Sequence, residues 1–299
     1  MAQAAVIGLG SMGFGMAESL RRAGFDVAGF DVTEANVTRF VAGGGRGAGS
    51  PAEAAAGAEV VIAVVVNAAQ TEAVLFGEGG CAEAMPEGAV FVASATMAPE
   101  VARALGARVE AGGRHYLDAP MSGGAARAAT GELTFLASGS AAAFGKARAA
   151  LDAMAGTVYE LGDAPGVGAG FKMVNQLLAG VHIAAACEAM AFAARQGLDL
   201  ARVYEVITKS AGNSWMFENR VPHILEGDYQ PRSAVDIFTK DLGIVLDMAR
   251  GAKFPVPVAG AALQMFLMTA AAGMGRDDDA SVARLFAQVA GLELPKAAE

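Results

Sequence analysis

The sequence predicts an α/β domain built on a parallel sheet, followed by an all-α domain. Short apolar segments alternate with helix-like segments up to about residue 162. A break containing Gly and Pro follows at residues 162–166, and almost no strand pattern appears beyond it. Strands alternating with helices are typical of a doubly wound sheet. We therefore expect a Rossmann-like N-terminal domain over residues 1–162 and a helical C-terminal domain over residues 163–299.

The first half contains the segments from which this sheet would be built. Residues 12–23 have the pattern of a helix, and residues 59–66 contain a continuous β-branched run. Such a run is typical of a central parallel strand that is buried on both faces. The expected strands are residues 4–7, 26–31, 59–66, 89–93 and 115–119.

The second half has helical periodicity throughout. A helix over residues 171–196 is apolar on most faces, so we expect it to be buried on all sides, partly by another subunit. Residues 254–275 carry no charge and are long enough to span a bilayer, but prolines and glycines interrupt them. A buried helix is therefore favoured over a membrane span. The other expected helices are residues 200–210, 214–225, 234–252, 258–272 and 279–289.

Composition excludes several classes of partner. The net charge is −9 and no run of Lys or Arg occurs, so we expect no nucleic-acid partner. Cys81 and Cys187 are far apart, which is typical of a reducing compartment and argues against disulfides and a metal site. The N-terminus lacks the basic region of a signal peptide. The expectation is a cytoplasmic protein with a small-molecule ligand and no membrane partner.

A glycine-rich turn follows the first expected strand and opens the first helix. Its residues are Gly8, Leu9, Gly10, Ser11, Met12 and Gly13. In the G-x-G-x-x-G pattern, the glycines permit a tight turn, close approach of the backbone to a pyrophosphate, and close packing of helix against strand. The pattern alone is weak, but here both the strand and the helix that it requires are predicted. This predicts a dinucleotide site.

Asp31 ends the second expected strand, 18 residues after Gly13. An acidic residue there takes the ribose hydroxyls of NAD and would repel the 2′-phosphate of NADP. No Arg or Lys follows before Arg39. We therefore expect NAD as the cofactor. The alternative is that Asp31 caps the next helix.

Four separated blocks give the chain its family resemblance. They are residues 7–13, residues 118–124 continuing to 131–134, residues 166–175 and residues 238–243. On these blocks the sequence resembles the β-hydroxyacid dehydrogenases, the family of 3-hydroxyisobutyrate dehydrogenase. The resemblance implies oxidation of the hydroxyl of a small hydroxy acid with NAD. Separately, burial of the apolar helical half predicts a homodimer or homotetramer.

The same resemblance assigns roles to residues. It implies Lys172 as the general base, Asn175 as its orienting or substrate-binding partner, and Ser122, Gly123 and Gly124 as the substrate carboxylate site. Partial desolvation at the start of an apolar helix would favour the neutral amine of Lys172. The implied cofactor contacts beyond the glycine turn and Asp31 are Val65, Val66, Gln70, Thr96 and Lys240.

Each assignment has a structural alternative. Lys172 could extend along the helix to solvent. Asn175 could be a polar residue satisfied inside the helical bundle. Ser122 to Gly124 could be only a flexible turn, and Lys240 could form a surface pair with Asp241.

Residues 66–70, 176–183 and 212–220 give a closer resemblance, to the L-threonate dehydrogenase branch of the family. It implies oxidation of L-threonate at carbon 2. The alternatives are a 3-hydroxyisobutyrate substrate, reduction of tartronate or succinic semialdehyde, and a non-catalytic NAD-binding sensor.

Overall fold

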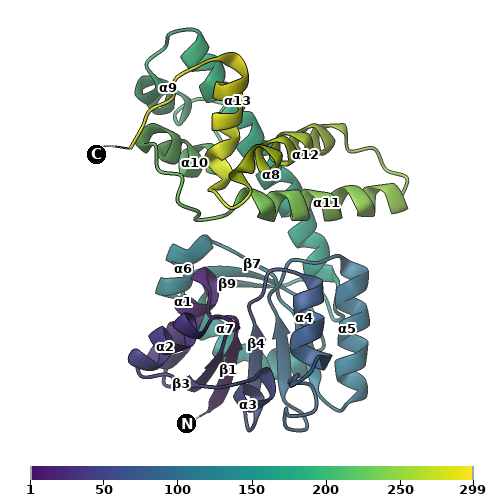
Figure 1. Cartoon of the computed structure of the whole chain (residues 1–299). Coiled ribbons are helices and arrows are strands. Elements are labelled where there is room, and N and C mark those ends of the chain that lie inside the picture. Colours follow the sequence, from purple (N-terminus) through teal and green to yellow (C-terminus); the bar gives the residue numbers. More distant parts are fainter. Residues whose placement is uncertain (1, 298–299) are drawn as a thin grey trace. The chain divides into compact units, whose positions relative to one another are not determined.

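The computed structural model describes residues 2–297, and the chain divides into two compact units (Figure 1). The first unit ends at Lys172 and the second begins at Met173. The division falls inside helix α8 (Val167–Arg195), so the first turns of this helix pack with the first unit.

The first unit is built on a six-stranded parallel sheet. Its strands are β1 (Gln3–Ile7), β2 (Asp26–Phe30), β3 (Arg46–Gly47), β4 (Val60–Ala63), β5 (Val90–Ala93) and β6 (His115–Asp118), in the order β3-β2-β1-β4-β5-β6. This is the Rossmann strand order, in which the direction of winding reverses between β1 and β4. The predicted Rossmann-like fold is confirmed.

Alternate residues of the central strands enter two different hydrophobic cores. Val60 and Ile62 pack with one core, whereas Val61 and Ala63 pack with the other. Both faces of β4 are therefore buried, which explains the continuous apolar run in its sequence. The helices of this unit are α1 (Ser11–Arg22), α2 (Glu34–Ala42), α3 (Pro51–Ala55), α4 (Ala68–Phe76), α5 (Pro99–Ala111), α6 (Gly124–Thr130) and α7 (Ala141–Met154).

A second, three-stranded sheet was not expected from the sequence. It consists of β7 (Met121–Ser122), β8 (Leu133–Ala137) and β9 (Ala155–Glu160), in the order β7-β8-β9. β7 pairs antiparallel with β8, and β8 pairs parallel with β9. β7 is only two residues long and β9 is largely exposed, so neither has a clear apolar pattern. The expected strand over residues 59–66 also proves shorter, and residues 64–66 form a loop after β4.

The second unit consists of helices in the part of the chain that the structure describes, apart from one isolated bridge between Ala234 and Asp278. The expected helices are found, with shifted ends. After α8 come α9 (Leu200–Ile207), α10 (Trp215–Glu226), α11 (Val235–Gly251), α12 (Pro257–Thr269), a π-helical turn (Ala270–Met274), a 3-10 turn (Asp279–Ser281) and α13 (Val282–Ala290).

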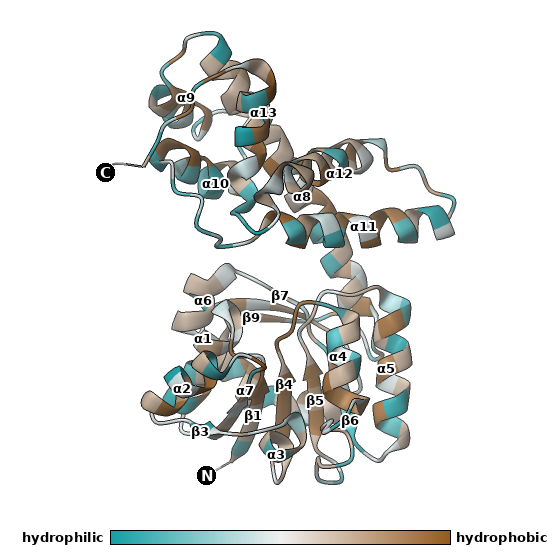
Figure 2. Ribbon diagram, viewed as in Figure 1, coloured by the Kyte–Doolittle hydropathy of each residue, from teal (hydrophilic) through white to brown (hydrophobic). Residues whose placement is uncertain are grey.

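Two helices are long and apolar enough to cross a membrane by length and composition alone: Val167–Arg195 and Pro257–Met274. About half of the most apolar window of the first is buried in the protein, and a third of that of the second. Figure 2 shows brown residues along both helices. In the single chain, α8 is not buried on all sides, since Val174, Leu178 and Phe192 are exposed.

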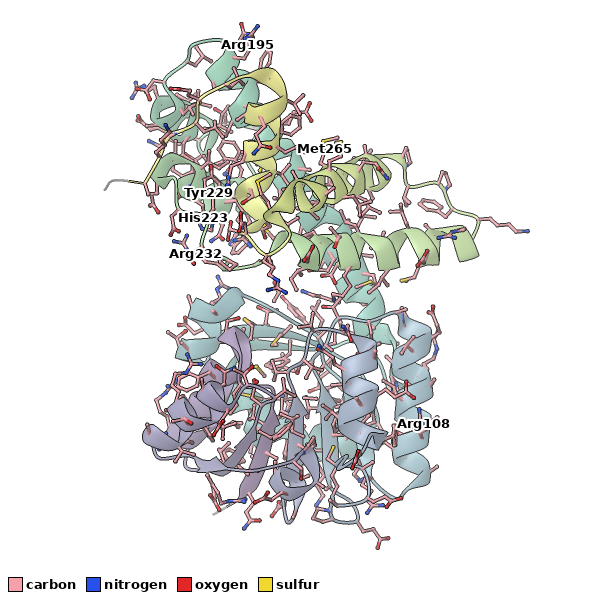
Figure 3. All side chains as sticks on the ribbon, in the orientation of Figure 1. Arg108, Arg195, His223, Tyr229, Arg232 and Met265 are labelled. Carbon is pink, nitrogen blue, oxygen red and sulfur yellow. The ribbon has the colours of Figure 1, made fainter. Side chains whose placement is uncertain are left out.

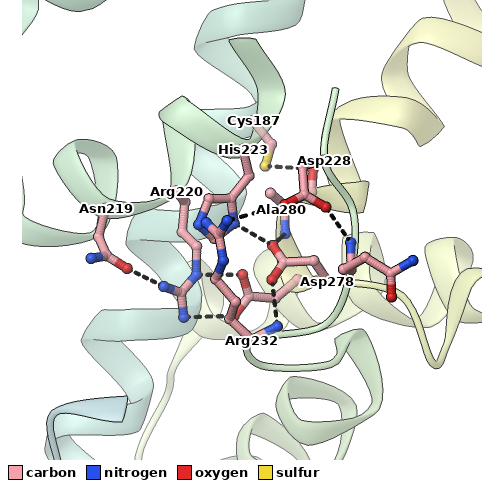
Figure 4. Close-up of polar contacts among 10 residues, drawn as sticks. Cys187, Asn219, Arg220, His223, Asp228, Arg232, Asp278 and Ala280 are labelled. Atoms are coloured by element: carbon pink, nitrogen blue, oxygen red, sulfur yellow. Dashed lines mark hydrogen bonds and ion pairs between the residues drawn. The ribbon is translucent and has the colours of Figure 1, made fainter. Parts of the chain in front are cut away.

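A buried ionic cluster ties α10 to the segment before α13 (Figures 3 and 4). Arg220 Nε donates to Asp279 Oδ1 at 2.6 Å, and His223 Nδ1 lies 2.8 Å from Asp278 Oδ1. Asp278 also accepts hydrogen bonds from the backbone amides of Arg232 and Ala280. Burial raises the pKa of Asp278, but these hydrogen bonds, led by that from His223, outweigh it and leave the pKa below its usual value.

Asp279 is the most deeply buried carboxylate of this cluster. Burial raises its pKa to about 6, although the Arg220 guanidinium acts in the opposite direction. Above that pH the carboxylate and the guanidinium form a charged pair, and removing either charge would leave the other buried without a partner.

We expect Asp279→Asn to lower the free energy of unfolding of the second unit by about 3 kcal/mol at pH 7.5, because the substitution strands the Arg220 charge. The chain has a single tryptophan, Trp215, at the start of α10, so urea unfolding followed by its fluorescence reports on this unit. The matched control is Arg202→Ala, which removes an exposed pair with Glu205 in the same unit and should cost less than about 1 kcal/mol. If both variants lower the free energy of unfolding equally, the buried pair is no more important for stability than an exposed one, and the prediction is wrong.

Candidate active site

The glycine-rich turn between β1 and α1 has the geometry that a dinucleotide pyrophosphate requires. A Cβ on Gly8 would lie 2.3 Å from the Val64 carbonyl oxygen, and one on Gly13 would lie 1.8 Å from the Gly8 oxygen. Gly8 also has a φ of +98°, which disfavours any other residue. A Cβ on Gly10 would meet no atom within 4 Å, so this glycine faces open space. Two glycines are thus needed for packing, and the third leaves room for a ligand.

The start of α1 can accept an anion. Gly10 is its N-cap residue and supplies no side-chain cap, and no acidic residue lies in the first turn. Backbone N–H groups at a helix N-terminus bind phosphate well. The turn therefore fits the pyrophosphate of NAD.

Asp31 follows β2 and is tied to the same turn. Its Oδ2 accepts a hydrogen bond from Leu9 N at 2.7 Å, and its Oδ1 accepts one from Thr33 N at 2.7 Å. The N-cap residue of α2 is Thr33, so Asp31 does not cap that helix. Arg39 reaches the turn as well and donates to the Leu9 carbonyl oxygen at 3.3 Å. Asp31 thus lies beside the expected pyrophosphate site.

The loop after β4 is held by side chains of α4. Gln70 Oε1 accepts from Val66 N at 2.8 Å, and Gln70 N donates to Asn67 Oδ1 at 2.9 Å. These two bonds hold Val66 and Asn67 in the loop that follows β4, the strand adjacent to β1. Thr96, half-buried, lies in the corresponding position after β5.

Ser122, Gly123 and Gly124 lead from β7 into α6. Ser122 pairs with Thr134 across the small sheet, which fixes its backbone. Gly123 and Gly124 have φ values of +135° and +75°, so this backbone path requires glycine at both positions. A Cβ on Gly124 would meet nothing within 4 Å, so the turn is open on that side.

Lys172 lies near the start of α8 and belongs to the first unit. The residue is 8% exposed, and its Nζ donates to the Met121 carbonyl oxygen at 2.8 Å. A lysine that extended to solvent would be far more exposed, so that alternative is wrong. The structure places the amine at the residue that precedes Ser122.

The first turn of α8 rests on two buried polar side chains. Asp118 Oδ2 accepts from Gly166 N at 2.9 Å and from Ala169 N at 2.8 Å. Ser138 Oγ accepts from Gly168 N at 2.9 Å and donates to Asp118 Oδ2 at 3.4 Å. Burial raises the pKa of Asp118 to about 6, although the hydrogen bonds from Ala169, Gly166 and Ser138 lower it.

Asn175 and Lys240 belong to the second unit and join a single polar chain there. Asn175 Nδ2 donates to Gln176 Oε1 at 2.9 Å, and Gln176 Nε2 donates to Asp241 Oδ2 at 2.6 Å. Lys240 Nζ lies 2.5 Å from Asp241 Oδ1. Lys240 does pair with Asp241, but Asp241 is buried, so this is not a surface pair.

The structure thus gathers most of the predicted site within the first unit. The glycine turn, Asp31, the loop after β4, Thr96 and the Met121 to Gly124 segment all follow the carboxyl ends of the parallel strands or continue from them. Ligands of open α/β sheets bind at this edge. Asn175 and Lys240 are placed within the second unit.

Four residues of this region were assigned no role from the sequence: Asp118, Ser138, Gln176 and Asp241. Each of them also bonds to a residue 30 to 65 positions away in the chain. Only Asp118 carried a local signal, as a carboxylate at the end of a buried strand. Among residues 2–297, no group of three or more His, Cys, Asp or Glu side chains could hold a metal ion.

Two family models match the chain in succession. Residues 3–162 match the NAD-binding domain of 6-phosphogluconate dehydrogenase. Residues 166–286 match the domain described as NAD-binding of NADP-dependent 3-hydroxyisobutyrate dehydrogenase.

Curated relatives match along the full length. The chain is 58% identical to the L-threonate dehydrogenase of Cupriavidus necator, over 98% of each protein. It is 47% identical to the L-threonate dehydrogenase of Escherichia coli K12, over 98% of this chain and 96% of that protein. The NAD-dependent L-serine dehydrogenase of Pseudomonas aeruginosa is 33% identical, over 96% of this chain and 98% of that protein.

A solved structure agrees with these matches. The crystal structure of 3-hydroxyisobutyrate dehydrogenase from Salmonella typhimurium matches with a TM-score of 0.91 and 47% identity, over 95% of this chain and 100% of that one. The chain therefore belongs to the 3-hydroxyisobutyrate dehydrogenase-like family of β-hydroxyacid dehydrogenases and is an NAD-dependent enzyme that acts on a small-molecule hydroxy acid.

Proposed function

We propose that the enzyme oxidises L-threonate at the carbon 2 hydroxyl, with Lys172 as the general base. The observation that carries the mechanism is the position of the Lys172 amine, buried and hydrogen-bonded to the Met121 carbonyl beside the Ser122–Gly124 turn. The substrate assignment is supported by the relatives named L-threonate dehydrogenase, which are 46–58% identical over nearly the whole chain.

Lys172 would take the hydroxyl proton. An alcohol loses a hydride easily only if its proton is removed at the same time by a positioned base. Because the amine is buried, it is shielded from bulk water and exchanges its proton with the bound substrate. The hydrogen bond to the Met121 carbonyl fixes the direction in which the amine points. NAD, when bound, supplies the carbon that accepts the hydride.

The Ser122–Gly124 turn would hold the substrate carboxylate. Successive glycines with positive φ turn backbone N–H groups toward one side, a geometry that suits an anion. The Ser122 hydroxyl adds a donor to this site. Asn175, with its amide already held by Gln176, would orient the substrate, and Lys240 would contact the cofactor from the second unit.

The residues also support a preference for NAD over NADP. The Asp31 carboxylate is held against the glycine turn by Leu9 N, where it would accept hydrogen bonds from ribose hydroxyls. A 2′-phosphate at the same place would meet the negative charge.

A second candidate activity is oxidation of 3-hydroxyisobutyrate. It is favoured by the name of the similar Salmonella typhimurium structure, which has the same 47% identity as the Escherichia coli L-threonate dehydrogenase. Reduction of a small semialdehyde, such as tartronate or succinic semialdehyde, uses the same groups in reverse. A non-catalytic NAD sensor is disfavoured because Lys172, Asn175 and Lys240 are all present.

We further propose a soluble cytoplasmic enzyme that acts as a homodimer or homotetramer. Exposed apolar side chains lie on α8 and on α12, where a second copy would cover them. They are Val174, Leu178, Phe192, Val258, Leu267 and Met268.

We expect reduction of NAD to be fastest with L-threonate among L-threonate, D-threonate, 3-hydroxyisobutyrate and D-glycerate. Absorbance of NADH measures the rate. Lys172→Ala should lower kcat by about a thousandfold, because it removes the general base, while NAD affinity stays within twofold. A higher kcat/KM for 3-hydroxyisobutyrate would replace the substrate and keep the mechanism, and wild-type turnover in Lys172→Ala would overturn the mechanism.

The double variant Asp31→Ser with Val32→Arg should shift the ratio of kcat/KM values from NAD toward NADP by at least about a hundredfold, because it replaces a repelling carboxylate with a cation. Val32 is 93% exposed, so the new side chain fits without repacking. Val41→Arg, which adds a cation near the end of α2 and keeps Asp31, is the control and should leave the ratio unchanged. If the double variant behaves like the control, Asp31 does not select the cofactor.

A further inference from the structure

We propose that Asp118, together with Ser138, is a positioning residue for the Lys172 amine. The two side chains hold the first turn of α8 against the carboxyl ends of β6 and β8, and this fixes where Lys172 begins. The proposal rests on the proposed function of Lys172 and adds a requirement for it.

The start of α8 takes its caps from distant parts of the chain. The first N–H groups of a helix have no partner within the helix and usually bond to the N-cap side chain. Here Gly166, which precedes the helix, has no side chain. Asp118 binds Gly166 N and Ala169 N from 48 and 51 residues away, and Ser138 binds Gly168 N from 30 residues away. The helix start is therefore fixed to the sheet and not to its own loop.

Steric contacts hold the same turn in place. A Cβ on Gly168 would lie 2.2 Å from the Leu136 carbonyl oxygen, so the helix backbone packs directly on β8. Gly166 has a φ of +96°, and a Cβ there would lie 2.8 Å from the Pro99 oxygen and 2.8 Å from Arg103 Nη1. The glycines allow this approach, and the Asp118 and Ser138 oxygens provide its polar contacts.

Two contacts connect the Asp118 segment to the Lys172 amine, one at the start of α8 and one at the tip of the lysine side chain. Lys172 lies three residues beyond Ala169, which is about one helical turn. Its Nζ returns to the carbonyl of Met121, three residues beyond Asp118. The helix start and the lysine tip are thus both bonded to residues 118–121, the segment that continues into Ser122. Moving either anchor moves the amine relative to the proposed carboxylate site.

The two carboxylate oxygens of Asp118 have different surroundings, which allows a sharp test. Oδ2 accepts hydrogen bonds from Ser138 Oγ, Gly166 N and Ala169 N. Oδ1 is buried without a hydrogen-bond partner among the described residues. Asparagine can keep an acceptor at the Oδ2 position. Positioning therefore needs the acceptor and not the charge, and Asp118→Asn should retain function that Asp118→Ala loses.

The test compares turnover of L-threonate, or of 3-hydroxyisobutyrate if that is the better substrate, in four variants. Asp118→Ala should lower kcat by about a hundredfold, the loss that a 1 Å misplacement of a reacting group produces. Asp118→Asn should stay within about fivefold of wild type, with NAD affinity by fluorescence titration unchanged in both. Ser138→Ala should lower kcat by about tenfold. Ser140→Ala is the matched control, because it likewise removes a serine hydroxyl that accepts from a helix N-terminus, but that of α7, at Ala143 N.

A rescue experiment separates positioning from a general loss of structure. Ethylamine can restore part of the turnover of Lys172→Ala by replacing the missing amine. This free amine is not attached to α8, so its action does not depend on where the helix starts. The double variant Lys172→Ala with Asp118→Ala should therefore be rescued to within twofold of the rate of rescued Lys172→Ala. A hundredfold loss of the rescued rate would overturn the proposal, as would equal losses in Ser138→Ala and Ser140→Ala. If Asp118→Ala does not fold, the serine pair and Asp118→Asn decide. Wild-type turnover in Lys172→Ala alone would instead show that the proposed function of Lys172 is wrong.

Discussion

The parallel direction of the six strands is the constraint on which the site depends. Parallel strands bring all their carboxyl ends to one edge of the sheet, so residues that are far apart in sequence meet there. The glycine turn follows β1, Asp31 follows β2, the Val65–Val66 loop follows β4, and Thr96 follows β5. Asp118 ends β6 and brings the start of α8 to the same unit. A single backbone arrangement thus brings the proposed cofactor contacts to one edge of the sheet, and the Asp118 and Ser138 side chains hold the helix that carries the proposed base.

The parts of this arrangement that could be predicted were those with a local signal. The glycine spacing, the distance to Asp31 and the long β-branched run each depend on neighbouring residues, so the Rossmann-like unit and its cofactor turn were recognisable from the sequence. The helices of the second unit were recognisable from their periodicity, although their ends moved by a few residues, as helix ends commonly do. The family resemblance singled out Lys172, and its burial agrees with that assignment.

The rest depends on contacts between distant segments. The small sheet was missed because β7 is two residues long and β9 faces solvent, so neither shows an alternating pattern. The bond between Gln176 and Asp241 joins residues 65 apart, and no local rule pairs them. Asp118 looked like an ordinary strand end, because its backbone partners, Gly166 N and Ala169 N, belong to residues without a polar side chain that would indicate a cap. Buried polar groups must find partners, but the sequence does not say which.

Helix α8 has a further consequence, because one continuous helix carries Lys172 in the first unit and Asn175 in the second. Each residue of an α-helix turns the chain by about 100° and advances it by about 1.5 Å. Inserting or deleting one residue between these positions would turn the Asn175 amide by about 100° around the helix axis relative to Lys172. The residue count along α8 therefore decides which side of this helix carries the Asn175 amide. Recombining the two halves of related enzymes requires a crossover that preserves the residue count along it.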